Sequence, residues 1–154
     1  MKKKQIQVQR ATSADSAAMT RLITASKSYW EYPSEWMELW KDELTITQEK
    51  LDERDFYLGK DGDDLVFVYS LSQLDANRYE LEECWVAPES IGRGYGQMLI
   101  DDVKERLGSL GAKQLKIISD PKAAGFYRRM GAMQVGEEPT KIAGRVFPVF
   151  ELKI

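Results

Sequence analysis

The sequence predicts an α/β fold built on one mixed sheet, with helices on both of its faces. Two observations lead to this prediction. Segments with period-two alternation, typical of strands, are separated by segments with helical stripes, in the order β-α-α-βββ-α-β-α-β-β. The first strand is followed by helices and then by a meander of strands, so parallel and antiparallel neighbours should occur in one sheet.

Composition limits the classes of function. The 154 residues suit one core, and we expect a single domain over residues 1–154. The net charge of −3 argues against nucleic-acid binding. Cys84 is the only cysteine and there is no histidine, so we expect neither a disulfide nor a metal site. No apolar run approaches the length of a membrane span, and we expect a soluble, cytoplasmic protein.

The N-terminal third is predicted to be a strand followed by helices. Lys4–Arg10 alternates as a half-buried strand does, and Thr12 or Ser13 can cap the helix that follows. That helix should end near Tyr29, because the residue before Pro33 is forced towards extended backbone. Its expected buried stripe is Met19, Leu22, Ile23, Ser26 and Trp30.

A second helix restarts at Pro33 and Ser34 and carries apolar residues as far as Leu44. Three of the four tryptophans lie between Trp30 and Trp40. Such a cluster fits either a packed core or an aromatic wall that faces a substrate, and the sequence leaves both open. After it, Thr47 can cap a short helix that runs through Arg54.

The middle and the end of the chain alternate between strands and helices. A meander is expected in which Asp61-Gly62 makes the first turn. Asp120-Pro121 begins the last helix, with Asp as the N-cap and Pro in the first turn. The expected strands are Phe56–Lys60, Leu65–Leu74, Arg78–Val86, Leu115–Ile118, a segment at Met133 and Val135, and Arg145–Leu152.

The stretch Cys84–Leu99 joins a strand, a glycine loop and a helix. Pro88 ends the strand, because proline cannot donate to a sheet ladder. Gly92, Gly94 and Gly96 follow, and a helix begins after them. Bare backbone lets N–H groups approach a ligand closely, and the N–H groups of a first helical turn have no partner inside the helix. The stretch therefore predicts a phosphate-binding site.

The spacing argues against two common nucleotide loops. No Gly-Lys-Ser/Thr follows, as a P-loop requires. Gln97 stands where the dinucleotide fingerprint has its third glycine. A different nucleotide ligand, or a tight turn with no ligand, stay open as alternatives.

The segment Ile91–Gly96 resembles the acetyl-CoA loop of the GCN5-related N-acetyltransferases, whose usual form is Gln/Arg-x-x-Gly-x-Gly/Ala. Gly94 and Gly96 match that form, and Ile91 departs from it. The resemblance implies the same fold, acetyl-CoA as cofactor, and a pyrophosphate held by the loop. The cofactor contacts expected from it are Trp85, Val86, Ile91, Gly92, Arg93, Gly94, Tyr95, Gly96, Gln97, Lys122 and Tyr127.

A second segment, Asp120–Ala132, is similar to another signature of that family, Asn-x-x-x-Phe/Leu-Tyr-x-x-x-Gly-Phe/Ala. Phe126 and Tyr127 match it, whereas Lys122 stands where the family often has Asn. The resemblance implies that the phenol of Tyr127 donates a proton or a hydrogen bond to the thiolate of coenzyme A. The alternative is a core tyrosine whose hydroxyl is satisfied by the protein.

Three carboxylates lie in the predicted strand before the loop. Glu80 and Glu82 share one face of that strand and Glu83 lies on the other, by the two-residue period. A partly buried carboxylate has a raised pKa and can accept the proton of an amine, so Glu80 or Glu82 is the expected base. A solvated strand face, ion pairs with basic residues, and a water as the base stay open.

Together these features predict an acetyl-CoA-dependent N-acetyltransferase that acts on a primary amine of a small molecule or a peptide. The alternative is a CoA-binding sensor or interaction module with the same fold and no turnover, motivated by Ile91 and Lys122. We expect no nucleic-acid, membrane or metal partner, and a homodimer that pairs through the last strands.

Overall fold

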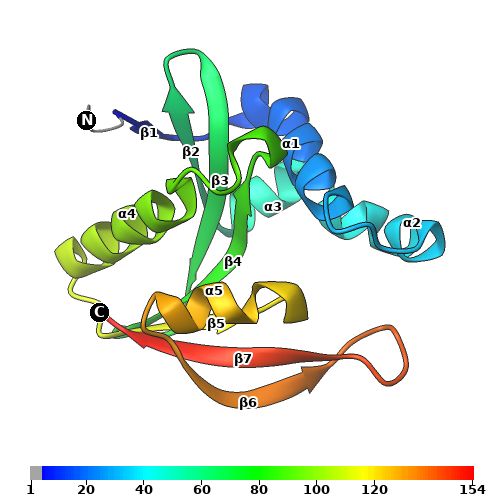
Figure 1. The fold of residues 1–154 in the computed structure, drawn as a ribbon. Helices are drawn as coiled ribbons and strands as arrows, with labels where there is room; N and C mark the ends of the chain where they lie inside the picture. Colours follow the sequence, from blue (N-terminus) through cyan, green and yellow to red (C-terminus); the bar gives the residue numbers. More distant parts are fainter. Residues whose placement is uncertain (1–4) are drawn as a thin grey trace. The chain divides into compact units, whose positions relative to one another are not determined.

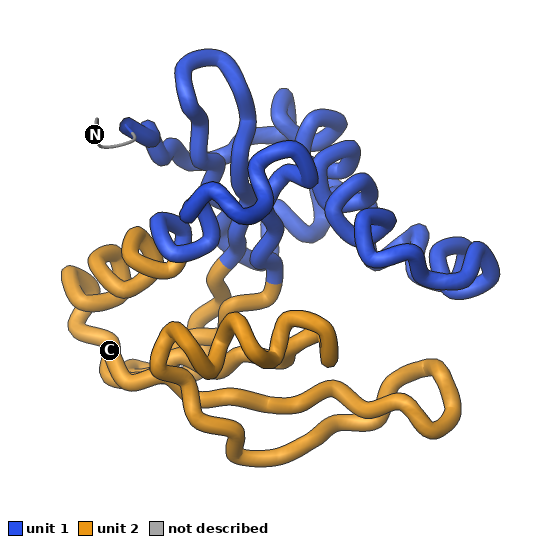
Figure 2. The backbone as a smooth tube through the Cα atoms, viewed as in Figure 1, with its two compact units in different colours: residues 1–70, 83–99 blue, residues 71–82, 100–154 orange. Residues whose placement is uncertain are grey.

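The structure is a computed structural model that describes residues 5–154, and it falls into two compact units. Unit 1 holds the described residues up to Ser70 together with Glu83–Leu99, and unit 2 holds Leu71–Glu82 and Ile100–Ile154 (Figure 2). Lys4, predicted to begin the first strand, lies outside the described residues.

The strands follow the order β1-β2-β3-β4-β5-β7-β6. β4 and β5 run parallel, whereas the pairs β1–β2, β5–β7 and β6–β7 are antiparallel. The predicted α/β fold with a mixed sheet is therefore confirmed. The prediction of a single domain stays a prediction.

Unit 1 contains a small antiparallel ladder and three helices (Figure 1). Its polar first strand is short, because only four residues pair with β2. α2 begins at Ser34, next to Pro33, where the sequence predicted that a helix restarts. Thr47 is the N-cap of α3, as predicted, and its hydroxyl accepts the Lys50 N–H at 3.3 Å. The elements are β1 (Gln7–Arg10), α1 (Ser16–Ser28), α2 (Ser34–Leu44), α3 (Gln48–Glu53), β2 (Asp55–Asp61), most of β3 (Asp64–Gln73), the end of β4 (Arg78–Val86) and the start of α4 (Tyr95–Ser109).

Unit 2 holds the remaining strands, with α5 lying along β5 and β7 (Figure 1). The ring centroids of Tyr127 on α5 and Phe150 on β7 are 6.0 Å apart. The predicted last helix divides in two: Asp120 caps a 3₁₀ turn over Pro121–Ala123, and α5 follows. The elements of this unit are the end of β3, the start of β4, most of α4, β5 (Gln114–Ile118), α5 (Ala124–Arg129), β6 (Met133–Pro139) and β7 (Val146–Lys153).

For one residue of the predicted helical stripe, Trp30, the prediction of burial is wrong. Met19, Leu22 and Ile23 are buried as expected, but Trp30 is 38% exposed. α1 ends at Ser28, so Trp30 lies beyond the helix and does not follow its inner face. Lys27 is buried in its place, with 7% of its surface exposed. Among residues 5–154 no helix is long and apolar enough to cross a membrane; the cytoplasmic location stays a prediction.

Gly59 shows how closely the β2–β3 region packs. A Cβ atom at this position would lie 2.4 Å from the nearest ring atom of Phe67, which is itself fully buried. Real Cβ contacts are never so short, and a buried ring has little room to withdraw. Only glycine fits there without displacing the core.

We predict that Gly59→Ala lowers the free energy of unfolding by about 1–3 kcal/mol, the usual cost of overpacking a core. Chemical denaturation followed by circular dichroism measures the change. Gly136→Ala is the matched control: a Cβ there meets nothing within 4 Å, so a change within about 0.5 kcal/mol is expected. Equal stability of the Gly59 variant and the wild type would contradict this account of the packing.

Candidate functional site

The glycine loop follows the end of β4 directly. A 3₁₀ turn over Pro88–Ser90 leads into it, and α4 begins at Tyr95. Gly92 and Gly94 have φ angles of 81° and 85°. This left-handed region costs a side-chain-bearing residue roughly 1–2 kcal/mol, so the backbone path itself requires glycine. The loop lies wholly in unit 1.

Backbone N–H groups of this loop are available to a ligand. Among the described residues, those of Gly92, Gly94 and Gly96 have no backbone acceptor. The N–H groups on either side are bonded: Ile91 donates to Pro88 and Met98 donates to Gly94, at 3.3 and 3.2 Å. Exposed and unbonded amides at a helix N-terminus are what an anionic ligand needs.

The space beside the loop is also open. A Cβ atom added at Gly92 or Gly94 would meet nothing within 4 Å. The helix that follows is anchored on its other side, because the buried Tyr95 donates a hydrogen bond to Asp61 Oδ2 at 2.9 Å. That bond raises the pKa of Tyr95 above its usual value. A rigid, open row of amides fits a diphosphate.

The other residues predicted around the cofactor lie along the same segment. Trp85 and Val86 end β4 and are half-buried. Ile91 is half-buried, while Arg93 and Gln97 are exposed. These placements give the residues access to a ligand of the loop, and their contacts with it stay a prediction.

Tyr127 and Lys122 belong to unit 2. Tyr127 is 6% exposed, and its ring lies 5.2 Å from that of Phe126, edge to face. Lys122 is exposed, and its backbone N–H donates to Asp120 at 2.9 Å. Tyr127 and the glycine loop thus lie in different units, and the role of this tyrosine in the reaction stays a prediction.

The two carboxylates expected to supply the base also lie in unit 2. Glu80 is half-buried and Glu82 is exposed. Burial raises the pKa of Glu80, and the hydrogen bond and negative charge of Glu82 raise it further. Lys116, with its Nζ 3.7 Å from both Glu80 Oε1 and Glu138 Oε1, acts in the opposite direction. Glu80 therefore holds its proton to a higher pH than an ordinary glutamate.

The sequence profile of the acetyltransferase (GNAT) family matches residues 19–132, which is most of the chain and includes both the glycine loop and Tyr127. The chain belongs to the GNAT family. Acetyl-CoA is the cofactor of this family, and the open amides at Gly92 and Gly94 fit its diphosphate. No curated protein sequence matches the chain.

Solved acetyltransferase structures share the fold of this GNAT protein. A GCN5-related N-acetyltransferase from Rhodopseudomonas palustris is 19% identical with a TM-score of 0.81, and the match covers 100% of this chain and 99% of that one. The PaiA N-acetyltransferase of Thermoplasma acidophilum, in complex with coenzyme A, is 18% identical with a TM-score of 0.78, over 97% and 99% of the chains. A GNAT acetyltransferase of Elizabethkingia anophelis with acetyl-CoA bound is 17% identical with a TM-score of 0.70, over 99% and 100%. At these identities the likeness is one of fold.

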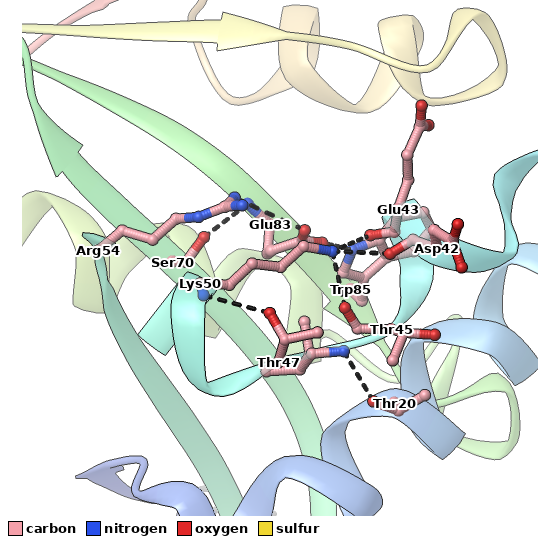
Figure 3. A network of polar contacts seen from close by, with 11 residues as sticks. Thr20, Asp42, Glu43, Thr45, Thr47, Lys50, Arg54, Ser70, Glu83 and Trp85 are labelled. Atoms are coloured by element: carbon pink, nitrogen blue, oxygen red, sulfur yellow. Dashed lines mark hydrogen bonds and ion pairs between the residues drawn. The ribbon is translucent and has the colours of Figure 1, made fainter. Parts of the chain in front are cut away.

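Sequence reasoning missed a polar network in unit 1 of this acetyltransferase, centred on Glu83 (Figure 3). Glu83 is 8% exposed. Its Oε2 accepts the indole N–H of Trp85 at 2.5 Å, its Oε1 lies 3.8 Å from Arg54 Nη1, and its backbone N–H donates to Ser70 Oγ at 3.0 Å. A carboxylate between Leu81 and Trp85 on the inner strand face was the available signal, because an isolated charge there needs a partner.

Lys50 on α3 is also part of this network (Figure 3). Its Nζ donates to the backbone carbonyls of Asp42, Glu43 and Thr45 at 2.9, 2.9 and 2.7 Å. Burial lowers the pKa of Lys50, partly offset by the negative charge of Glu83. The ammonium therefore binds carbonyls at the C-terminal end of α2 and holds α3 beside them.

We predict that Gly94→Ala weakens coenzyme A binding by about tenfold or more, because the left-handed backbone is strained by any side chain and each 1.4 kcal/mol is a factor of ten. Isothermal titration calorimetry measures it. Gly108→Ala is the matched control. Gly108 is exposed on α4, and a Cβ atom added there would meet nothing within 4 Å. The affinity of this variant for coenzyme A should equal that of the wild type. Equal weakening by both substitutions would contradict the assignment of the loop.

Proposed function

We propose that this GNAT protein transfers the acetyl group of acetyl-CoA directly to a primary amine of a small molecule or a peptide. The observation that carries the proposal is the row of open, unbonded amides at Gly92 and Gly94, at the start of a helix in a chain of this family. A diphosphate fits that row, and a thioester arm would extend from it.

When bound, acetyl-CoA supplies an acetyl group activated as a thioester. In the proposal the loop amides hold the diphosphate, so the helix start at Tyr95 fixes where the rest of the cofactor runs. Backbone N–H groups at Trp85 or Val86 polarise the acetyl carbonyl, stabilising the negative charge that develops on its oxygen. The hydroxyl of Tyr127 donates to the sulfur as the C–S bond breaks.

The amine must lose a proton before it can attack. In the proposal Glu80, or Glu82 beside it, takes that proton from the substrate ammonium, directly or through a water. The nitrogen then forms a bond to the acetyl carbon, and the C–S bond breaks. The ammonium loses two protons in all. One leaves to solvent by way of the carboxylate, and the other replaces the proton that Tyr127 gives to the thiolate, so the products are an amide, a thiol and one released proton.

The charge around the proposed base favours cationic acceptors. Glu80 and Glu138 each pair with Lys116, and Glu82 interacts with Glu80, so three carboxylates gather beside one ammonium. Their combined negative potential attracts a protonated amine. The choice between a small molecule and a peptide is left to the substrate panel below.

A homodimer through the last strands is part of the proposal. β6 lies at the end of the strand order, so one of its sides is open for pairing. Met133 and Val135 on β6 are 72% and 56% exposed, and Val146 on β7 is 42% exposed. Exposed apolar side chains along an edge strand favour pairing with a second copy.

The alternative function is a CoA-binding sensor without turnover. Two residues favour it. Ile91 gives the loop an apolar side chain where relatives usually have Gln or Arg, and Lys122 is an exposed lysine where they often have Asn. An apolar side chain makes no hydrogen bond to a phosphate, and a lysine cannot accept one.

We predict that the wild type releases thiol from acetyl-CoA with at least one member of a primary-amine panel, and that Tyr127→Phe lowers kcat by about 10²-fold with the KM for acetyl-CoA nearly unchanged. A thiol-reactive dye follows the reaction. Tyr57→Phe, which removes the hydroxyl of another buried tyrosine, is the control and should retain activity. Coenzyme A binding without thiol release across the panel would favour the sensor instead.

We predict that kcat/KM rises with pH on the acid side of its pH profile, and that this acid limb follows the deprotonation of Glu80. Only the deprotonated carboxylate is a base, so activity rises with pH through its raised pKa. Glu82→Gln removes two causes of that rise and should move the limb to lower pH, whereas Lys116→Met should move it to higher pH. Glu80→Gln should remove the limb and lower the rate.

Glu137→Gln is the control for these variants, because Glu137 is an exposed carboxylate of β6. Its profile should superimpose on that of the wild type. Loss of activity in Glu82→Gln but not in Glu80→Gln would assign the base to Glu82, and an unchanged limb in all variants would leave the proton to water.

A further inference from the structure

Lys27, on the last turn of α1, is a buried lysine whose ammonium lies against aromatic rings. Its exposed fraction is 7%. The distances from Nζ to the ring centroids of Trp40, Tyr32 and Trp85 are 4.2, 4.8 and 5.8 Å. All of them fall within the range of cation–π attraction, about 6 Å. These three rings, called the aromatic box below, take the place of much of the water that would solvate the ammonium.

The aromatic box is braced by ring contacts of its own. Tyr32 and Trp40 meet edge to face, with centroids 5.0 Å apart. Trp36 backs both rings, at 5.9 Å from Tyr32 and 5.8 Å from Trp40. Such pairs hold their rings in place whether or not a cation lies between them. The ring contacts thus support the box independently of the contacts that Lys27 makes.

Electrostatics favour a cation at this position. The indole N–H of Trp85 donates to the buried carboxylate of Glu83 at 2.5 Å. A hydrogen bond to an anion pushes electron density into the indole ring, and cation–π attraction acts on the negative face of that ring. The negative potential at the face of the Trp85 ring thus favours a positive ligand over a neutral ligand of the same shape.

One wall of the aromatic box stands on a loop. Tyr32 lies between α1 and α2, directly after Glu31, whose φ of 55° is left-handed although Glu31 is not a glycine. Tyr29 and Trp30, in the same loop, are 49% and 38% exposed. Lys27 itself enters on a flexible four-carbon stem from the end of a helix.

We propose that the aromatic box is a binding site for alkylammonium ligands, and that Lys27 is an internal occupant which such a ligand displaces. The inference concerns binding only and does not rest on the proposed acetyl transfer. Choline is the probe, because its trimethylammonium head carries a charge and cannot donate a hydrogen bond through nitrogen. Its neutral isostere, 3,3-dimethylbutan-1-ol, has the same shape and is the matched control ligand.

The first experiment removes the internal competitor. Lys27→Met should bind choline about tenfold more tightly than the wild type, because the ligand no longer has to displace an ammonium from the rings. Tryptophan fluorescence titration measures both affinities. The isostere should show no such gain, and Lys41→Met, which removes an exposed lysine of α2, should behave as the wild type.

The second experiment uses the wild type, so it does not depend on the folding of a variant. An amine-reactive label is applied with and without saturating choline, and the labelling of Lys27 is read by mass spectrometry. Displacement should raise labelling of Lys27 severalfold with choline and not with the isostere. Unchanged labelling, or a folded Lys27→Met that binds choline no more tightly than the wild type, would overturn the proposal and make Lys27 a permanent structural cation.

Discussion

Glu83 imposes the strongest constraint on unit 1, because a carboxylate that is 8% exposed has to be neutralised inside the protein. An unpaired buried charge costs several kcal/mol, so each of its partners is held in place as firmly as the charge itself. Arg54, beside the end of α3, pairs with the carboxylate, and Trp85 donates its indole N–H to it. Ser70 on β3 contacts the same residue differently, because its hydroxyl accepts the backbone N–H of Glu83. Trp85, one of the rings around Lys27, is oriented by its bond to Glu83.

The backbone N–H groups of the glycine loop differ in their bonding from the polar groups around Glu83. Around Glu83 the polar groups are bonded within the protein, whereas at Gly92 and Gly94 the backbone N–H groups have no backbone acceptor among the described residues. Buried polar groups without partners would destabilise the fold, so such groups are tolerated here only because the loop is exposed. Unit 1 thus combines a hydrogen-bonded polar cluster around Glu83 with exposed backbone amides at the glycine loop.

Local patterns could be predicted from the sequence, and long-range ones could not. The bounds of the strand Arg78–Val86 were predicted correctly, because alternation and a following proline act within a few residues. The glycine loop was readable for the same reason. Trp30 was wrongly placed in the core, and the burial of Lys27 was missed, because the rings that cover it come from separate segments. The ion pair of Glu83 joins residues far apart in sequence, which no local pattern reports.

The carboxylate pair on β4 has a further consequence for a chain without histidine. Ordinary side-chain pKa values leave an interval of several pH units between carboxylates and the thiol, phenol and ammonium groups, and histidine normally fills it. Burial and Glu82 raise the pKa of Glu80 in the direction of that interval. As the pH falls, Glu80 therefore takes up a proton before an ordinary glutamate would, and its negative charge on β4 is lost earlier.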